Sequence, residues 1–316
     1  MPPPPPAGRP GDLLKLLRPR QWTKNLVCVG GAFFSGHMFD MRYAERAAVV
    51  VVAFSAVSSF VYIVNDVLDR EQDRNHPRKK LRPIAAGTVS IPQAMLLAVL
   101  MVCVAIVLAA LLGPAVLAIL ATYVVMNFCY SAVLKNLSLV DATVVAAGFI
   151  LRIYAGTAAV HVSPSAWLLL CAFFLSLFLA FGKRRAELNA VTGQKSGADA
   201  GLREPEAPAV DVTATRGVLH KYNVAMLDRF CNICATLTIA TYALYSALGH
   251  PNRTLIVTTV PVVMGIFRYL LLVERYQEGE APDAILVKDW PIQMAILLWL
   301  ILYVSVIYFG LQIDVQ

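Results

Sequence analysis

The sequence has little charge for its length. Only 15% of its 316 residues are Asp, Glu, Lys or Arg, whereas 58% are hydrophobic and the mean hydropathy is +0.65. Soluble globular chains are typically about 25% charged and about 45–50% apolar. The shortage of charge therefore argues against a soluble enzyme and indicates a membrane protein. The apolar runs are continuous rather than alternating, which argues against a β-barrel.

Signatures of other protein classes are also missing. No internal repeat relates two halves of the chain, which argues against a transporter or channel built from repeats, although this class stays an alternative. The D-G-x-x-A-R opening of CDP-alcohol phosphotransferases is absent. Histidine is scarce, with five residues, and none stands out as a general base; we interpret His76 as a loop residue. We expect no nucleic-acid partner.

Nine apolar stretches approach the roughly 20 residues that cross a bilayer. They cover residues 25–40, 44–64, 92–112, 114–134, 138–160, 164–182, 230–249, 253–273 and 290–310. The sequence therefore predicts an all-α polytopic membrane protein, a bundle of nine transmembrane helices.

The bundle is expected to form a single membrane-embedded catalytic domain over residues 15–316. Residues 1–14 are rich in proline and low in complexity, which predicts a disordered tail. Residues 191–218 mix glycine, proline, alanine and charge without periodicity, which predicts a flexible cytoplasmic loop.

Lysine and arginine fall mainly on one side of these spans. If the N-terminus is cytoplasmic, only Arg42, Arg46 and Arg253 lie on the opposite side. Cytoplasmic loops of membrane proteins are rich in these residues, so we expect a cell-membrane protein with segment 62–87 at the cytoplasmic face. The oligomeric state is left open, with a homo-oligomer among the alternatives.

A dense group of acids ends the second expected span. At 100° per residue, Asp66, Asp69 and Asp73 fall within about 60° of one another on a helix, and Asn65 adjoins them. Carboxylates this close repel one another unless a cation lies among them. Oxygen ligands suit Mg²⁺, which also binds water and substrate phosphates. We therefore predict that these four residues bind Mg²⁺ beside a phosphorylated ligand.

Basic residues gather at the same expected membrane face. The set comprises Arg18, Arg20, Lys24, Arg78, Lys79, Lys80, Arg82, Lys183, Arg184 and Arg185. Such a cluster suits a ligand with several negative charges. The alternative is that the acids pair with Arg70, Arg74 and Arg78 on a solvated helix end.

The pattern N-D-x-x-D-x-x-x-D at Asn65–Asp73, followed by RPIAAG at Arg82–Gly87, resembles the UbiA superfamily of intramembrane prenyltransferases. The resemblance implies a UbiA-like bundle of nine helices with a cavity in the membrane. It also implies that Asp-rich motifs hold Mg²⁺ and a diphosphate.

Three further stretches are similar to one group in that superfamily, the decaprenyl-phosphate phosphoribosyltransferases. They are LRPRQWTKN at Leu17–Asn25, YSAVLKNLSLVDATVVAAGFILRIYAG at Tyr130–Gly156 and FGKRRAEL at Phe181–Leu188. Resemblance to this group implies that the protein transfers a 5-phosphoribosyl group from 5-phosphoribosyl 1-diphosphate to a polyprenyl (decaprenyl) phosphate and releases diphosphate. It also implies that the lipid product is used in the synthesis of a lipid-linked arabinose donor for cell-wall polysaccharide.

The alternative is a UbiA-type prenyltransferase that moves a polyprenyl group from its diphosphate to an aromatic acceptor. Such enzymes usually carry a second motif, D-x-x-x-D, after the sixth helix. This chain has Lys183, Arg184, Arg185 and a single acid, Glu187, there. More bases and fewer acids fit a donor that carries a 5-phosphate as well as a diphosphate.

The candidate catalytic residues are Asp69, Asp73, Lys24 and Arg152. Arg152 falls inside an expected span, where a charge is costly and by default functional. It is interpreted as facing a phosphate, with an ion pair to Asp141 as the alternative.

Candidates for substrate binding are Arg20, Lys24, Asn65, Arg78, Lys80, Arg82, Lys135, Asp141, Arg152, Tyr154, Lys183, Arg184, Glu187 and Tyr222. Structural roles stay open for several of them. Asp141 could be a ligand or an ion-pair partner. Lys135 could belong to the site or simply reflect the excess of basic residues on the cytoplasmic side. Glu187 is close enough along a helix to pair with Arg184. Aromatic packing at the membrane interface explains the two tyrosines equally well.

Overall fold

The described chain is helical throughout. The computed structural model describes residues 10–76, 79–192, 221–275 and 288–312, in which all regular structure is α- or 3₁₀-helix. Within these residues, eight helices are long and apolar enough to cross a membrane. They are α3 (Met41–Leu68), α5 (Ile91–Leu112), α6 (Pro114–Ala132), α7 (Val140–Ala159), α8 (Ala166–Thr192), α9 (Val224–Leu248), α10 (Thr259–Arg275, preceded by η6, Arg253–Thr258) and α12 (Trp290–Ile307). The prediction of an all-α polytopic membrane protein is confirmed.

The first of the nine expected spans, residues 25–40, is not a long helix. The 3₁₀ helix η1 covers Pro19–Val29 and the short helix α2 covers Gly30–Phe34. This segment packs backbone to backbone on α7: a Cβ added to Gly156 would lie 1.9 Å from the carbonyl oxygen of Cys28. Because the backbone of η1 contacts α7 directly and the polar Asn25 is buried, this segment does not form the straight apolar helix that hydropathy predicts.

Two predicted boundaries also change. Helix α1 covers Pro10–Leu17, so helical structure begins inside the tail predicted for residues 1–14; residues 1–9 lie outside the described residues. Helix α8 continues to Thr192, two residues into the loop predicted for 191–218. The remainder of that loop lies outside the described residues.

The chain divides into two compact units; a single catalytic domain stays a prediction. Unit 1 holds residues 1–134 and 150–164, and unit 2 holds residues 135–149 and 165–316. Helix α7 thus contributes its first half to unit 2 and its second half to unit 1. Each unit has a hydrophobic core of its own.

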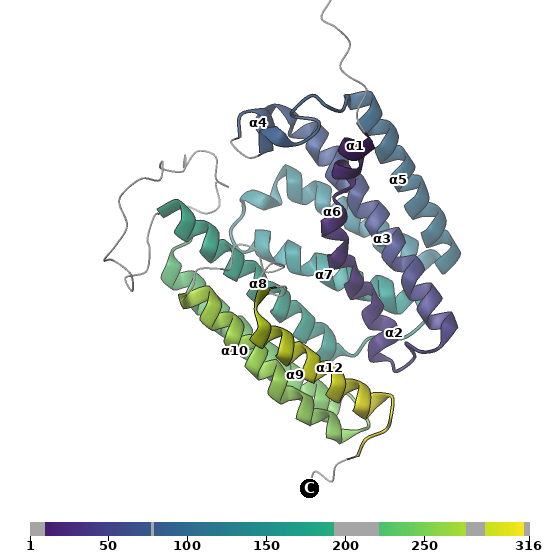
Figure 1. The fold of residues 1–316 in the computed structure, drawn as a ribbon, viewed down its shortest axis with the longest axis vertical. Coiled ribbons are helices and arrows are strands. Elements are labelled where there is room, and N and C mark those ends of the chain that lie inside the picture. The colour runs from purple at the N-terminus through teal and green to yellow at the C-terminus, as the bar shows by residue number, and fades with distance from the viewer. Residues whose placement is uncertain (1–9, 77–78, 193–220, 276–287, 313–316) are drawn as a thin grey trace, which may run out of the picture. The chain divides into compact units, whose positions relative to one another are not determined.

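Helix α3 is central to the core of unit 1. It packs along α5 and also contacts α6 and η1, and Figure 1 shows α3 and α5 side by side. Helix α5 buries a row of small side chains, Ala94, Ala98, Ala105 and Ala109. Small residues let helices in a bilayer approach closely enough for good dispersion contacts. The opposite face of α5 exposes large side chains such as Leu96 and Leu111, as expected for contact with acyl chains.

Local signals set both ends of α5. Ser90 and Gln93 bond reciprocally through side chain and backbone, which forms a capping box at the N-terminus. At the other end, Gly113 has a φ of 128°, in a region that side chains disfavour. Pro114 then begins α6. A single residue therefore joins two spans.

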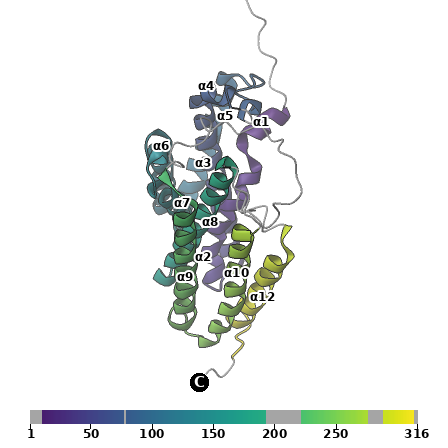
Figure 2. The same cartoon turned by 90° about the vertical axis from the view of Figure 1, so that its left-hand side faces the viewer.

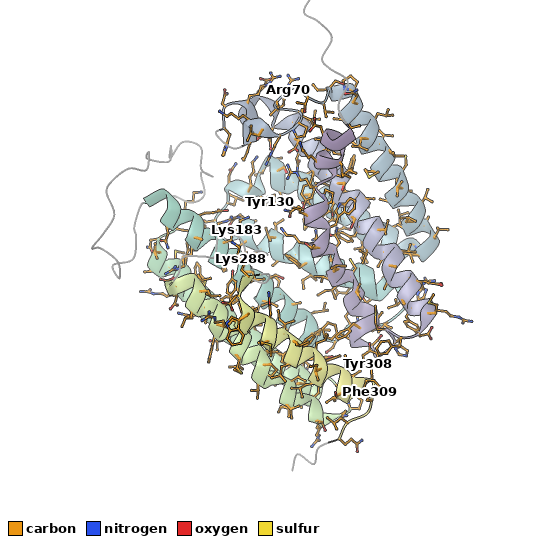
Figure 3. All side chains as sticks on the ribbon, in the orientation of Figure 1. Arg70, Tyr130, Lys183, Lys288, Tyr308 and Phe309 are labelled. Carbon is orange, nitrogen blue, oxygen red and sulfur yellow. The ribbon has the colours of Figure 1, made fainter. Side chains whose placement is uncertain are left out.

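In unit 2, α8 packs along α9, and α10 packs along α12; Figure 2 shows the latter pair from the side. Lys288 precedes α12, whereas Tyr308 and Phe309 follow its other end (Figure 3). Hydroxyl groups link these helices inside the apolar core. The indole nitrogen of Trp299 donates to the Tyr242 hydroxyl at 2.6 Å. Bonds of this type between membrane helices contribute about 0.6 kcal/mol each on average.

Candidate functional site

Two acids of the predicted motif converge on one arginine in unit 1. Asp66 lies in the last turn of α3, and Asp73 lies in the short helix α4 (Arg70–Arg74) that continues it. Nη1 of Arg82 donates to Oδ1 of Asp66 at 3.0 Å and to Oδ2 of Asp73 at 2.6 Å. Nη2 of Arg18 also donates to Oδ1 of Asp66 at 2.6 Å. The common face predicted for these two acids is therefore present.

The ion-pair partners differ from those considered in the sequence. The alternative interpretation named Arg70, Arg74 and Arg78. Instead, Arg70 and Arg74 bond to Glu71, and Arg78 lies outside the described residues. The nearby Arg70 guanidinium holds the pKa of the exposed Glu71 carboxyl below its usual value. Figure 3 shows Arg70 on α4, at the end of unit 1.

A small hydrophobic cluster positions both arginines over the acids. It joins Leu16 of α1, Ile63 of α3 and Ile84 of the RPIAAG loop, which are all fully or nearly fully buried. Leu16 and Ile84 lie two residues from Arg18 and Arg82, respectively. Arg18 has a φ of 53°, and its guanidinium lies over the ring of Tyr62 at 4.9 Å from the centroid. The loop and α1 are thus packed so that each presents its arginine to Asp66.

Asn65 and Asp69 form a second pair at the same helix end. They are four residues apart and therefore neighbours on a helix surface. Oδ1 of Asn65 is buried and accepts no hydrogen bond from the described part of the chain. Asp69 is half-buried, and its carboxylate makes no ion pair or hydrogen bond with the residues that the structure describes. A buried acceptor without a donor is costly, and the oxygens of this pair could be satisfied by a ligand.

Carboxylate and amide oxygens are suitable ligands for Mg²⁺, but the three Asp side chains are not grouped around one position where the ion could bind. In the described part of the chain, no three His, Cys, Asp or Glu side chains are grouped to hold a metal ion. Arginines occupy Asp66 and Asp73, which leaves Asn65 and Asp69 as the oxygen ligands that fit the ion. Mg²⁺ usually takes one or two carboxylates and completes its shell with water and phosphate.

The other candidate residues of unit 1 differ in exposure. Arg20 is exposed on η1, and Lys24 is half-buried on the same element. Lys80 is exposed on η2 (Lys79–Leu81). Tyr154 is 41% exposed on α7.

Arg152 is buried far from the acids. Its Nε donates to Oδ1 of Asn25 at 2.8 Å and its Nη2 to the Tyr123 hydroxyl at 3.2 Å. Its guanidinium also lies over the rings of Phe54 and Tyr123. Phe54 precedes Asp66 by twelve residues, or about 18 Å along a helix. The structure therefore does not bring Arg152 together with the acidic motif. Instead, Arg152 links its own helix, α7, to η1 and to α6.

A separate buried network surrounds Asp141 in unit 2. Its Oδ2 accepts from Nε of Arg184 at 2.8 Å, and its Oδ1 accepts from the Tyr222 hydroxyl at 3.1 Å. That hydroxyl accepts in turn from the backbone N–H of Leu139 at 2.6 Å. Burial raises the pKa of Tyr222, so it stays protonated as a donor. Asp141 is therefore an ion-pair partner, of Arg184 rather than of Arg152.

The remaining candidates of unit 2 lie on α8 and η3 (Leu134–Asn136). Glu187 pairs with Nη1 of Arg184 at 2.9 Å, which is the helix-surface pair left open by the sequence. Lys183 is exposed near the C-terminal end of α8 (Figure 3). Lys135 is half-buried. These residues are placed within unit 2 only.

Sequence reasoning missed two functions of nearby residues. Arg185, grouped with the bases expected at the membrane face, is buried, pairs with Asp228 and donates to the carbonyl oxygen of Val273 at 2.6 Å. It therefore ties α8 to α9 and α10. Asn25, the last residue of LRPRQWTKN, bonds to Arg152 and Ser55; a polar residue at the start of an expected span was the available signal.

Comparison with known proteins places this geometry in a family. The chain matches the UbiA prenyltransferase family over residues 26–299. The chain belongs to this family. The resemblance read from its motifs is confirmed.

Full-length relatives narrow the comparison. The chain is 31% identical to the decaprenyl-phosphate phosphoribosyltransferase of Mycobacterium tuberculosis over 312 residues, which cover 97% of each chain. It is 33% identical to that of Mycolicibacterium smegmatis, over 97% of this chain and 95% of the relative. Among solved structures, a UbiA homolog from Archaeoglobus fulgidus bound to GPP and Mg²⁺ has a TM-score of 0.69 at 18% identity, covering 94% of this chain and 99% of that one. At that identity the likeness shows the fold.

Proposed function

We propose that this UbiA-family member is a phosphoribosyltransferase. It transfers the 5-phosphoribosyl group of 5-phosphoribosyl 1-diphosphate to a polyprenyl phosphate and releases diphosphate. The observation that carries this proposal is the similarity to decaprenyl-phosphate phosphoribosyltransferases over nearly the whole of both chains. Within residues 183–185, only Lys183 is exposed and available to the phosphates of the donor, since Arg184 and Arg185 pair with acids.

The chemistry makes modest demands on protein side chains. Diphosphate leaves the anomeric carbon of the ribose, and negative charge gathers on the leaving group. The acceptor is a phosphate monoester whose second pKa is near 6, so it is an anionic nucleophile at neutral pH. No general base is required. The main task is to stabilise the charge on the leaving group, which fixed cations do without transferring a proton.

The acidic motif and its arginines supply the groups for this task. Asn65 and Asp69 would hold Mg²⁺, which when bound neutralises developing charge on the diphosphate. Arg18 and Arg82 are each about 30% exposed and would meet the phosphates from the protein side. Exclusion of bulk water by surrounding helices would protect the activated ribose from hydrolysis.

The site also suits a water-soluble donor and a lipid acceptor. The motif lies at the end of α3, where a long apolar helix gives way to charged α4 and η2. In the proposed arrangement this end faces the cytoplasm of a cell membrane, and the polyprenyl tail remains in the bilayer. The lysines and arginines that flank the motif support that orientation.

Product analysis tests the proposal. Membranes that contain the protein are incubated with phosphoribosyl diphosphate, decaprenyl phosphate and Mg²⁺, and lipids are analysed by mass spectrometry. We expect a phosphoribosylated lipid that disappears with EDTA and falls at least a hundredfold in D69N. Absence of this lipid from the wild-type reaction would reject the proposal.

The family itself supports a second candidate, transfer of a prenyl group to an aromatic acceptor. The family description is that of prenyltransferases, and the Archaeoglobus structure holds GPP. A prenylated aromatic product from a prenyl diphosphate, without ribosylated lipid in the first assay, would favour this alternative.

A further inference from the structure

We propose that Arg46 and His161 form a pH-sensitive latch at the end of unit 1 opposite the acidic motif. The latch joins the second turn of α3 to the last residues of α5 and α7 while His161 is neutral, and it opens when His161 takes up a proton. Figure 1 shows this end of unit 1, where α2 lies, away from α4. The proposed reaction uses neither residue.

A single guanidinium ties three helices together at this end. Nε of Arg46 donates to the carbonyl oxygen of Ala159, the last residue of α7. Its Nη2 donates to the carbonyl oxygen of Leu112, the last residue of α5, at 3.0 Å. The last carbonyl groups of a helix have no partner within that helix. Arg46 therefore satisfies one such group on each of two helices.

The same guanidinium fixes the charge state of the imidazole of His161. Nη2 of Arg46 also lies 3.0 Å from Nε2 of His161. Because a guanidinium can only donate, Nε2 must accept, which requires a neutral ring with its proton on Nδ1. An imidazolium carries a proton on both nitrogens and cannot accept. Protonation of His161 therefore removes this bond and brings two positive charges together, which repel each other.

The backbone at His161 makes a histidine there unexpected. Helix α7 ends in a Schellman motif: the N–H of Val162 donates to the carbonyl oxygen of Thr157 at 3.0 Å, and the N–H of His161 to that of Ala158 at 3.2 Å. His161 has a φ of 57°, and glycine usually occupies this position of the motif. A side chain in this conformation costs energy that surrounding contacts must offset. The bond to the guanidinium is a contact that glycine could not make.

No acid of the described chain competes for the imidazole. The loop before α3 and the first turns of α3 pack against the segment that follows α7. Their charged or titratable groups are His37, Asp40, Arg42, Tyr43, Glu45 and Arg46, whereas α2, the α5–α6 junction and the rest of segment 160–165 have none. Neither Asp40 nor Glu45 bonds to His161 among the described residues, and His37 stacks on Tyr43 at 4.6 Å. The charge that the imidazole meets is therefore the guanidinium.

The pH range of the latch follows from the two kinds of side chain. Arginine stays charged, whereas histidine changes its charge between about pH 5 and pH 8. The latch is therefore closed in the upper part of this range and opens as the pH falls. In the proposed orientation this end faces the extracytoplasmic side, so the latch responds to acidity there. Because Gly156 near the end of α7 lies against the backbone of Cys28, opening also loosens the support of η1.

Hydrogen exchange of the purified full-length protein in lipid nanodiscs tests the latch. The reporters are the backbone amides of residues 157–162, compared at about pH 7.5 and about pH 5.5 after correction for the intrinsic pH dependence of exchange. We expect the wild type to exchange at least about fivefold faster at the lower pH. H161N should change by less than about twofold, because asparagine tolerates the left-handed conformation and accepts from Arg46 but does not titrate.

Three variants separate the latch from a general loss of structure. H161K carries a permanent charge and should exchange rapidly at both pH values. H37Q is the matched control, since it removes the other histidine at this end and should keep the wild-type response. If H161N does not fold, H161G provides the same comparison, because it suits the backbone and cannot titrate.

Two results would overturn the latch. One is a wild type whose corrected exchange does not depend on pH, or depends on it as much as that of H161N. The other is a response that disappears in H37Q but persists in H161N, which would assign it to His37.

Discussion

At the scale of single residues, the buried charges of each unit are matched by partners that fix their direction. In unit 2, Arg184 is 4% exposed and lies between Asp141, which is fully buried, and Glu187, which is 22% exposed. The two acids contact the same guanidinium but differ in solvent access. They therefore allow the effect of burial on an ion pair to be measured within one cluster.

Asp141→Asn should destabilise the protein by about 3–5 kcal/mol, because it removes the fully buried counter-charge of Arg184 and leaves only the partly solvated Glu187. Glu187→Gln should cost about 0–1 kcal/mol, because that partner is partly solvated. Equilibrium unfolding in mixed micelles measures both. Equal losses for the two variants would contradict the role given to burial.

Residue contacts also mark the limit of what the sequence predicts. The common face of Asp66 and Asp73 follows from spacing, because both lie on one nearly continuous helix. Arg18 is 48 residues from Asp66, and Asn25 is 127 residues from Arg152. Such pairs depend on how elements pack, which local periodicity does not encode. The sequence therefore predicted the charged end of α3 but did not predict which acidic and basic side chains pair with each other.

At the scale of elements, the segment η1–α2 depends on glycine. Cys28 in η1 is fully buried, and its carbonyl oxygen occupies the space where Gly156 of α7 would carry a Cβ. Hydropathy predicted a membrane span here because it counts apolar side chains. It does not register a backbone that lies directly on a neighbouring helix.

Gly156→Ala should displace η1, because the new Cβ would clash with backbone atoms of Cys28, which cannot move aside as a flexible side chain can. We expect a destabilisation of at least about 2 kcal/mol, within the range for overpacking, and weaker diphosphate binding through the shift of Arg18. Gly265→Ala on α10 is the matched control, since its Cβ would meet Ala295 at an ordinary 3.7 Å. Unfolding and calorimetry measure the two effects; the same stability for both variants would contradict the clash.

At the scale of the whole molecule, the eight apolar helices found in the described residues establish a multi-pass membrane protein. Hydropathy located each of these spans, because in lipid every backbone polar group must be satisfied within its own helix. Charge asymmetry adds an orientation that can be tested on α3. Its 28 residues extend about 42 Å, so its two ends lie on opposite sides of a bilayer.

Arg42→Cys places a thiol in the first turn of α3, and Lys79→Cys places one beyond its other end; both positions are exposed. In intact cells, a membrane-impermeant maleimide should label Arg42→Cys and should label Lys79→Cys only after the membrane is opened. The parent protein, with its six native cysteines, sets the background. Labelling of Lys79→Cys in intact cells would reverse the proposed orientation.

The single residue between α5 and α6 has a consequence for biosynthesis. Gly113 leaves no room for a hydrophilic stretch that the translocation machinery could retain on one side. The two helices must therefore enter the bilayer together, as a preformed hairpin, and the direction of the second is dictated by the first. Lengthening this connection with charged residues would uncouple them and put every later helix at risk of inversion.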